Sequence, residues 1–171
     1  MMKDILMARE NRWRYTNALL DKFKLPIITI TLNIPGNEKC KEDYIEAHKN
    51  ITKDFIAYLN NKELPIFHLE SRVEGDGPEV FLIIDCNERY LKEIAVEFEE
   101  NHLLGRIADI DIKGREKESW SRKDLGLDER QCLVCNNPAR RCIISKRHSL
   151  EEILHSIDQI IYSYDNVGDK L

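Results

Sequence analysis

Apolar residues recur every three or four positions in four segments of the chain, which is the spacing of amphipathic helices. In the first segment the polar side carries Arg9 and Arg12, one turn apart, and Pro26 follows the last apolar position. In the last segment Ser149 is placed as the N-cap and Glu152 completes a capping box. The expected helices cover residues 5–23, 44–59, 88–99 and 150–164.

Shorter apolar and β-branched runs separate these helices and predict strands. Residues 27–32 alternate Ile and Thr, and residues 80–84 form an unbroken apolar run. The Gly-rich segment 74–78 predicts a tight turn, so the strands on either side of it should form a hairpin. The expected strands cover residues 27–32, 66–70, 80–84 and 106–112, with a short partner strand around Trp120 after a turn at 114–118.

The resulting order of elements predicts an α+β fold. Strand, helix, strand, strand, helix and strand follow one another, as in a ferredoxin-like βαββαβ core. To this core the sequence adds an N-terminal helix, the extra short strand, a Cys-bearing loop and a C-terminal helix. We expect a single domain over residues 1–171, in which residues 128–148 form a Cys/His-bearing loop module.

Composition excludes some classes of protein. The chain has 26 basic and 31 acidic residues, a net charge of −5, which disfavours a nucleic-acid-binding surface. No apolar run reaches the roughly 20 residues needed to cross a membrane. The first ten residues lack the pattern of a signal peptide, so we expect a cytoplasmic protein whose five cysteines are thiols or metal ligands.

Two aspartates in the strand expected at 106–112 provide the clearest chemical signal. Residues two apart in a strand point to the same face, so Asp109 and Asp111 place two carboxylates side by side, about 6 to 7 Å apart. Such a pair repels itself unless a hard cation such as Mg²⁺ lies between the oxygens, as in enzymes that transfer nucleotidyl groups. The alternative is a solvated edge strand without chemistry.

Two residues before the strand favour the catalytic interpretation. Gly105 permits a close approach of a ligand to the backbone, and Arg106 offers a guanidinium group to phosphate. A third metal carboxylate is not fixed by the sequence, and Glu70, Asp85 and Glu99 are the candidates.

Three cysteines and a histidine lie within residues 132–148. Cys132, Cys135, Cys142 and His148 match the ligands of a tetrahedral structural Zn²⁺ site, although the later spacing differs from common zinc patterns. The alternative is a set of small buried cysteines. No strand-then-helix context surrounds Cys132 and Cys135, which argues against a thioredoxin-like redox role.

An ordered set of motifs resembles the citrate lyase phosphoribosyl-dephospho-CoA transferases, also called holo-acyl-carrier-protein synthases of citrate lyase. The chain departs from the family pattern at Leu103, where a proline is expected. The motifs are Ala8-Arg9-Glu10-x-Arg12, Leu32-Asn33-Ile34-Pro35-Gly36, His102-x-Leu104-Gly105-Arg106-x-x-Asp109-x-Asp111-Ile112, Ser121-Arg122, and Arg130-x-Cys132-x-x-Cys135 with Ala139, Cys142 and His148.

The resemblance implies a reaction and a set of roles. The prosthetic group would pass from triphosphoribosyl-dephospho-CoA to a serine of the apo acyl carrier subunit of citrate lyase, with release of pyrophosphate. Asp109 and Asp111 would hold Mg²⁺, one also helping to deprotonate the serine, and Arg106 would grip the triphosphate with Gly105 beside it.

Four further residues are weighed against structural roles. Arg9, Arg12 and Arg122 would contact phosphate or the carrier, or else form surface ion pairs. His102 would contact phosphate, or else cap a helix. The loop carrying Arg140, Arg141 and Arg147 would meet an acidic carrier.

Two other functions remain open at this point. One is a zinc-binding interaction module without catalysis, and the other is a different metal-dependent nucleotidyltransferase or a phosphohydrolase. A related transferase serves malonate decarboxylase, but the Cys-rich tail resembles the citrate lyase family instead.

Overall fold

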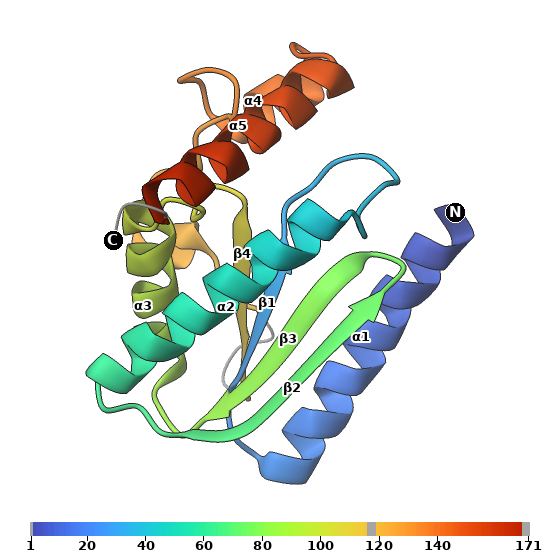
Figure 1. Cartoon of the computed structure of the whole chain (residues 1–171). Coiled ribbons are helices and arrows are strands. Elements are labelled where there is room, and N and C mark those ends of the chain that lie inside the picture. The colour runs from blue at the N-terminus through green and yellow to red at the C-terminus, as the bar shows by residue number, and fades with distance from the viewer. Residues whose placement is uncertain (1, 116–118, 169–171) are drawn as a thin grey trace.

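The computed structural model describes residues 2–115 and 119–168. Helices and strands alternate largely as the hydrophobic pattern predicts, and Figure 1 labels them. In chain order they are α1 (Met2–Phe23), β1 (Ile27–Leu32), α2 (Glu42–Asn61), β2 (Ile66–Glu74), β3 (Gly77–Ile84), α3 (Glu88–Asn101), β4 (Ala108–Lys113), the 3₁₀ helix η1 (Arg122–Leu125), α4 (Ala139–Ile144) and α5 (Leu150–Gly168).

The four strands form one antiparallel sheet in the order β2-β3-β1-β4. The predicted hairpin is confirmed, since β2 and β3 are paired up to Glu74 and Gly77. The chain therefore has an α+β architecture, with five α-helices and four strands among the described residues. β4 lies at one edge of the sheet, and β1 is its one neighbour.

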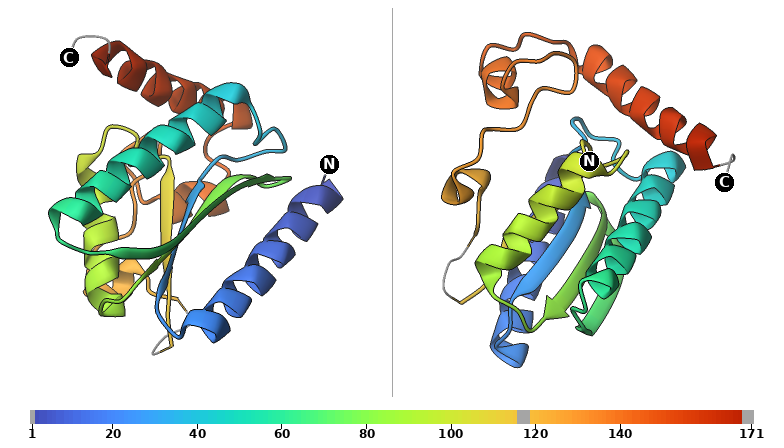
Figure 2. Two further views of the ribbon diagram at one scale, coloured as in Figure 1. Left: turned by 60° about the horizontal axis from the view of Figure 1, so that its bottom comes forward. Right: turned by 90° about the vertical axis from the view of Figure 1, so that its left-hand side faces the viewer.

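Helices cover both faces of the sheet, as Figure 2 shows. The larger core lies between the sheet and α2, α3 and α5, and the buried Phe55, Leu91 and Ile157 belong to it. α1 covers part of the other face, where Leu19 packs on Ile27 and Phe81. No helix of the described residues combines the length and apolarity of a membrane span.

β4 follows the alternation that its sequence predicts. Ala108, Ile110 and Ile112 are buried in the larger core, while the residues between them face the side of the sheet on which α1 packs. The strand begins at Ala108, two residues later than expected, because residues 103–107 form turns. β2 and β3 are longer than expected, since both strands extend to the hairpin turn.

Two expectations for the second half of the chain are wrong. The short strand around Trp120 is not formed at the described residues 119–121, where a single backbone hydrogen bond joins Trp120 N to Ile112 O at 3.4 Å. Part of the turn expected at 114–118 lies outside the described residues. Residues 128–148 are more than a loop, because they contain α4 and a bridge between Gln131 and Pro138.

Side chains form hydrogen bonds with the backbone groups on the outer edge of β4. Lys92 Nζ donates to Ile110 O at 2.8 Å, and Ile110 N donates to Glu99 Oε1 at 3.1 Å. Arg130 Nη1 donates to Ala108 O at 3.0 Å. An edge strand without such partners offers free backbone groups to other chains, so these contacts both protect β4 and fix its position.

Candidate functional site

Asp109 and Asp111 project from β4 toward the α1 side of the sheet. The register with β1 places Asp109 opposite Thr31 and Asp111 opposite Thr29. The side chain of Asp109 is 41% exposed, and Asp111 is also exposed, whereas both threonines are buried. The structure therefore brings the two predicted carboxylates together on one face, open to solvent and flanked by hydroxyl groups.

Arg130 links this pair to the buried Glu99. Its Nη2 lies 2.5 Å from Glu99 Oε1 and 3.5 Å from Asp109 Oδ1. The side chain of Glu99 is 2% exposed, and burial raises its pKa although the charge of Arg130 opposes that shift. Arg130 has no role among the predictions from the sequence, where its one signal is its place in the motif that contains Cys132.

A cavity of about 530 Å³ borders Asp111 between β4 and α1. Arg9, Arg12 and Trp13 contribute to its wall from α1, and Lys113 contributes from β4. We refer to it as the α1 cavity. Partial burial by this wall and the negative charge of Asp109 raise the pKa of Asp111 above its ordinary value. A bound cation would offset the same repulsion.

Arg9 and Arg12 also form ion pairs at the β2–β3 hairpin. Arg9 Nε and Arg12 Nη2 lie 2.9 and 3.0 Å from Asp76 Oδ2, and Lys39 Nζ lies 2.9 Å from Asp76 Oδ1. Arg12 Nε contacts the buried Glu79 at 2.5 Å. Burial opposes ionisation of Asp76, but the hydrogen bonds of Arg9 and Lys39 prevail and lower its pKa. The two arginines are thus held rigidly beside the α1 cavity.

A second cavity, of about 450 Å³, lies on the other side of Arg130 and is lined by three arginines. Arg106, Arg122 and Arg130 line it, and Gly105 lies among them. Four acidic residues also line it, namely Glu99, Glu100, Asp128 and Glu129. We refer to it as the arginine cavity. Arg106 Nη2 donates to Cys132 O at 2.5 Å, and Arg122 Nη1 donates to Glu100 Oε1 at 2.7 Å. Arg106 and Arg122, two of the predicted phosphate ligands, therefore line one cavity, and Arg130 connects that cavity to Asp109.

Gly105 has a packing role in addition to its place in this cavity. A Cβ atom at Gly105 would lie 2.1 Å from Glu99 O, so only glycine fits against the end of α3. The space that the missing side chain leaves is thus filled by α3 backbone. Its contact with a substrate remains a prediction.

His102 lies on the opposite side of the sheet from the two aspartates. It is the C-cap of α3, and its ring stacks on Phe98 with 4.7 Å between centroids. Nδ1 accepts a hydrogen bond from Leu104 N, so Nε2 carries the proton and donates to Asp54 Oδ2 at 3.0 Å. Phe98 and Asp54 belong to α3 and α2, on the face of the sheet away from the aspartates. The structure therefore favours a role for His102 as the C-cap of α3 over contact with phosphate.

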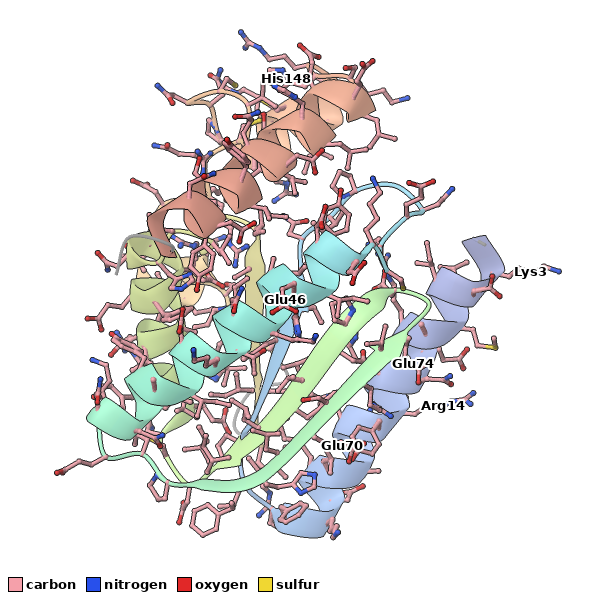
Figure 3. All side chains as sticks on the ribbon, in the orientation of Figure 1. Lys3, Arg14, Glu46, Glu70, Glu74 and His148 are labelled. Carbon is pink, nitrogen blue, oxygen red and sulfur yellow. The ribbon has the colours of Figure 1, made fainter. Side chains whose placement is uncertain are left out.

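The three candidates for a third carboxylate are far from equivalent. Glu70 accepts a hydrogen bond from Tyr15 and lies on β2, at the edge opposite β4, as Figure 3 shows. Asp85 is exposed at the end of β3. Glu99 alone among them reaches the pair, through Arg130. Glu79 on β3 shares the face of the pair, a position that the sequence analysis missed.

The predicted cysteine cluster forms in the structure. One ligand atom from each of four residues lies within 4.8 Å of the other three, an arrangement that could hold a metal ion. Cys135 Sγ is 3.6 Å from Cys142 Sγ and 3.3 Å from His148 Nε2. Figure 3 labels His148 at the end of the molecule where α5 begins. The four residues are Cys132, Cys135, Cys142 and His148.

Comparisons with known proteins show what the chain as a whole is similar to. A family model described as apo-citrate lyase phosphoribosyl-dephospho-CoA transferase matches residues 1–164. Proteins of that name from Citrobacter koseri and Escherichia coli O7:K1 are 29% and 31% identical over 151 residues, which is 88% of this chain and 82% of each relative. Protein CitXG of Leuconostoc mesenteroides subsp. cremoris is 33% identical over 154 residues, and the matched part is 32% of its length.

Proposed function

The chain belongs to the apo-citrate lyase phosphoribosyl-dephospho-CoA transferase family, and from this premise we propose that it attaches that prosthetic group to the acyl carrier subunit of apo-citrate lyase. It is accordingly a transferase, of the nucleotidyltransferase type, and not an interaction module without catalysis. The proposed donor is triphosphoribosyl-dephospho-CoA, the acceptor is a serine hydroxyl of the carrier, and pyrophosphate is the second product.

One observation carries this proposal. Asp109 and Asp111 share an exposed face of β4, with the α1 cavity bordering Asp111 and Arg130 of the arginine cavity beside Asp109. A polyphosphate needs both a carboxylate-bound cation and guanidinium groups around its oxygens. The edge of the sheet at β4 supplies both kinds of group, since each carboxylate of the pair lies beside one of the two cavities.

The carboxylate pair fits a magnesium ion. Both side chains are accessible, their oxygens are the ligand type that Mg²⁺ prefers, and their mutual repulsion favours a cation between them. Asp109 and Asp111 would hold the ion, which would supply charge neutralisation to the phosphate oxygens and leave room for waters and substrate.

The protein's own groups account for the remaining steps. Arg106, Arg122 and Arg130 would bind the terminal phosphates of the donor in the arginine cavity, and Arg9 and Arg12 would bind its other charged part in the α1 cavity. One carboxylate of the pair would accept the proton of the serine. The serine Oγ forms a bond to the α-phosphorus while the bond to pyrophosphate breaks, so the arginines stabilise the leaving charge.

We further propose that the cysteine cluster binds zinc. Three thiolates and one imidazole complete a tetrahedral shell and leave no open position, which fits a structural role. The cluster connects to the site because Arg106 donates to the backbone carbonyl of Cys132. Metal analysis of the purified protein should find about one zinc per chain, and Cys142→Ser should lower both zinc content and melting temperature. Full stability in a zinc-free protein would contradict this assignment.

The element order and the strand order β2-β3-β1-β4, with α2 and α3 on one face, support our assignment of the core to the ferredoxin-like class. The cytoplasmic location remains a prediction from the sequence.

The test of the reaction combines the protein, apo carrier, donor and Mg²⁺ and follows the carrier by intact mass. The carrier should gain the mass of the prosthetic group, and pyrophosphate should appear in equal amount. Asp109→Asn and Asp111→Asn should each reduce the rate by a factor of about 100 or more, since each removes a metal ligand. Asp21→Asn, at an exposed position of α1, is the matched control.

Two results would contradict the proposal. A normal rate in both variants would show that the pair is not the metal site. Pyrophosphate release without any carrier present would indicate a hydrolase.

A further inference from the structure

The helix α4 exposes apolar side chains that a folded protein normally buries. Cys142 is the one buried residue of this helix, and it belongs to the cysteine cluster. Ile143 and Ile144 next to it are 72% and 75% exposed, more than the other exposed large apolar residues of the described chain. Two adjacent isoleucines in water are unfavourable unless a partner covers them.

Four basic residues flank these isoleucines in the sequence. Residues 138–148 contain no acidic residue, although the chain as a whole has a net charge of −5. No ion pair engages any of the four within the described residues 2–115 and 119–168, whereas most arginines of the site do form one. We call these six residues the α4 surface: Arg140, Arg141, Ile143, Ile144, Lys146 and Arg147.

The fold holds this surface in a fixed orientation. Cys142 anchors α4 through the cluster, Cys142 O accepts from Arg147 N at 3.0 Å, and Cys132 N donates to Asn137 O at 2.8 Å. The exposure of the isoleucines is therefore built into the folded state, because the same contacts that bury Cys142 turn its neighbours outward.

The α4 surface is also connected to the candidate active site. Cys132 O accepts from Arg106, and Arg130, two residues earlier, contacts Asp109 and Glu99. In Figures 1 and 2, α4 lies near the end of the sheet at which β4 begins. A protein bound at α4 would thus lie on the same end of the molecule as the carboxylate pair.

We propose that the α4 surface docks the acyl carrier subunit through an acidic surface with an exposed apolar side chain, close to the serine that is modified. This inference rests on the proposed function. The four basic groups, which form no ion pair among the described residues, match a negative partner, and the two exposed isoleucines between them in the chain supply an apolar contact. Anionic lipid offers similar charge, but a six-residue helix with two exposed isoleucines is a small anchor for a membrane.

Docking is measured without the donor, so that no chemistry contributes. The affinity of the full-length protein for fluorescently labelled apo carrier is determined by anisotropy at several salt concentrations. Arg140→Glu/Arg141→Glu should weaken binding by a factor of about ten or more and reduce its salt dependence. Ile143→Ser/Ile144→Ser keeps every charge and should also weaken binding.

Lys49→Glu/Lys53→Glu is the matched control, because it reverses two exposed basic residues of α2 and should leave the affinity unchanged. Circular dichroism and zinc content of each variant establish that the fold is retained. In the transfer assay both α4 variants should raise KM for the carrier and leave kcat near that of the wild type.

Four outcomes decide between the possibilities. Weaker carrier binding in both α4 variants supports the proposal, and unchanged affinity in both overturns it. Loss of binding to phosphatidylserine vesicles with unchanged affinity for the carrier overturns it in favour of a membrane contact. Wild-type binding that depends on the α4 surface but produces no modified carrier supports docking and refutes the proposed reaction instead.

Discussion

Replacing Arg130 by methionine tests the contacts that hold the candidate site together. Methionine keeps much of the length of the side chain but removes the charge and every hydrogen bond of the guanidinium group. Three contacts disappear together, those with Ala108 O, Glu99 and Asp109. The variant therefore leaves a carboxylate buried at Glu99 without its nearest cation.

The expected loss of stability follows from the burial of Glu99 and Arg130. The Glu99 side chain is 2% exposed and that of Arg130 is 28% exposed, so the pair is shielded from solvent on the Glu99 side only. Removing one member of a buried pair costs about 3 to 5 kcal/mol, and the exposure of Arg130 favours the lower end, about 3 kcal/mol. In a chain of this size that corresponds to a melting temperature lower by roughly 6 to 12 °C.

Urea unfolding at fixed zinc concentration measures the loss, and a double-mutant cycle identifies its cause. Glu99→Gln in the Arg130→Met background should recover about 2 kcal/mol, because the amide carries no charge and its oxygen still accepts from Ile110 N. Arg130→Lys keeps the charge but lacks the several N–H donors of the guanidinium group, so its free energy of unfolding should lie between those of wild type and Arg130→Met. Equal stability of Arg130→Met and wild type, or no recovery with Glu99→Gln, would show that this ion pair does not stabilise the fold.

Three further predictions concern single contacts. Burial lowers the pKa of His48 in the folded protein, so on acidification the unfolded chain takes up this proton at a higher pH than the folded one. The free energy of unfolding should therefore fall below pH about 6.5, by at most about 1.4 kcal/mol per pH unit. In urea titrations across pH 5 to 8, this fall in the free energy of unfolding should be smaller for His48→Gln than for the wild type. The exposed control His155→Gln should show the same fall as the wild type. Gly105→Ala should lower the free energy of unfolding by about 1 to 3 kcal/mol in the same assay, since its Cβ meets Glu99 O. Ser149→Ala should cost about 1 kcal/mol by removing the N-cap of α5, and unchanged melting would contradict that role.

The spacing of hydrophobic residues along the chain was sufficient to predict the helices and strands of the core and their order. The alternation in residues 108–113 even identified the face on which Asp109 and Asp111 lie, because side-chain direction in a strand depends on position alone. The cysteine cluster was predictable for a similar reason, since few structures bring three thiols and an imidazole into one short segment without a common centre.

Contacts between distant segments were beyond such local reasoning. Arg130 reaches β4 and Glu99 across 22 and 31 positions of the chain, and nothing in the spacing of these residues signals their contact. The ion pairs of Arg9 and Arg12 with Asp76 depend on α1 crossing the β2–β3 hairpin. The strand predicted near Trp120 failed because a lone backbone hydrogen bond does not extend a sheet.

The edge position of β4 makes the alignment of this one strand decisive for the geometry of the candidate site. β1 is its single strand neighbour, so a shift of one residue along β1 would turn Asp109 and Asp111 into the apolar layer and bring Ile110 out to water. The hydrogen bonds of Lys92, Glu99 and Arg130 with the outer backbone groups of β4 oppose that register shift. Redesigns of α3 or of the segment around Arg130 must therefore preserve this hold on the strand, even where they leave both aspartates untouched.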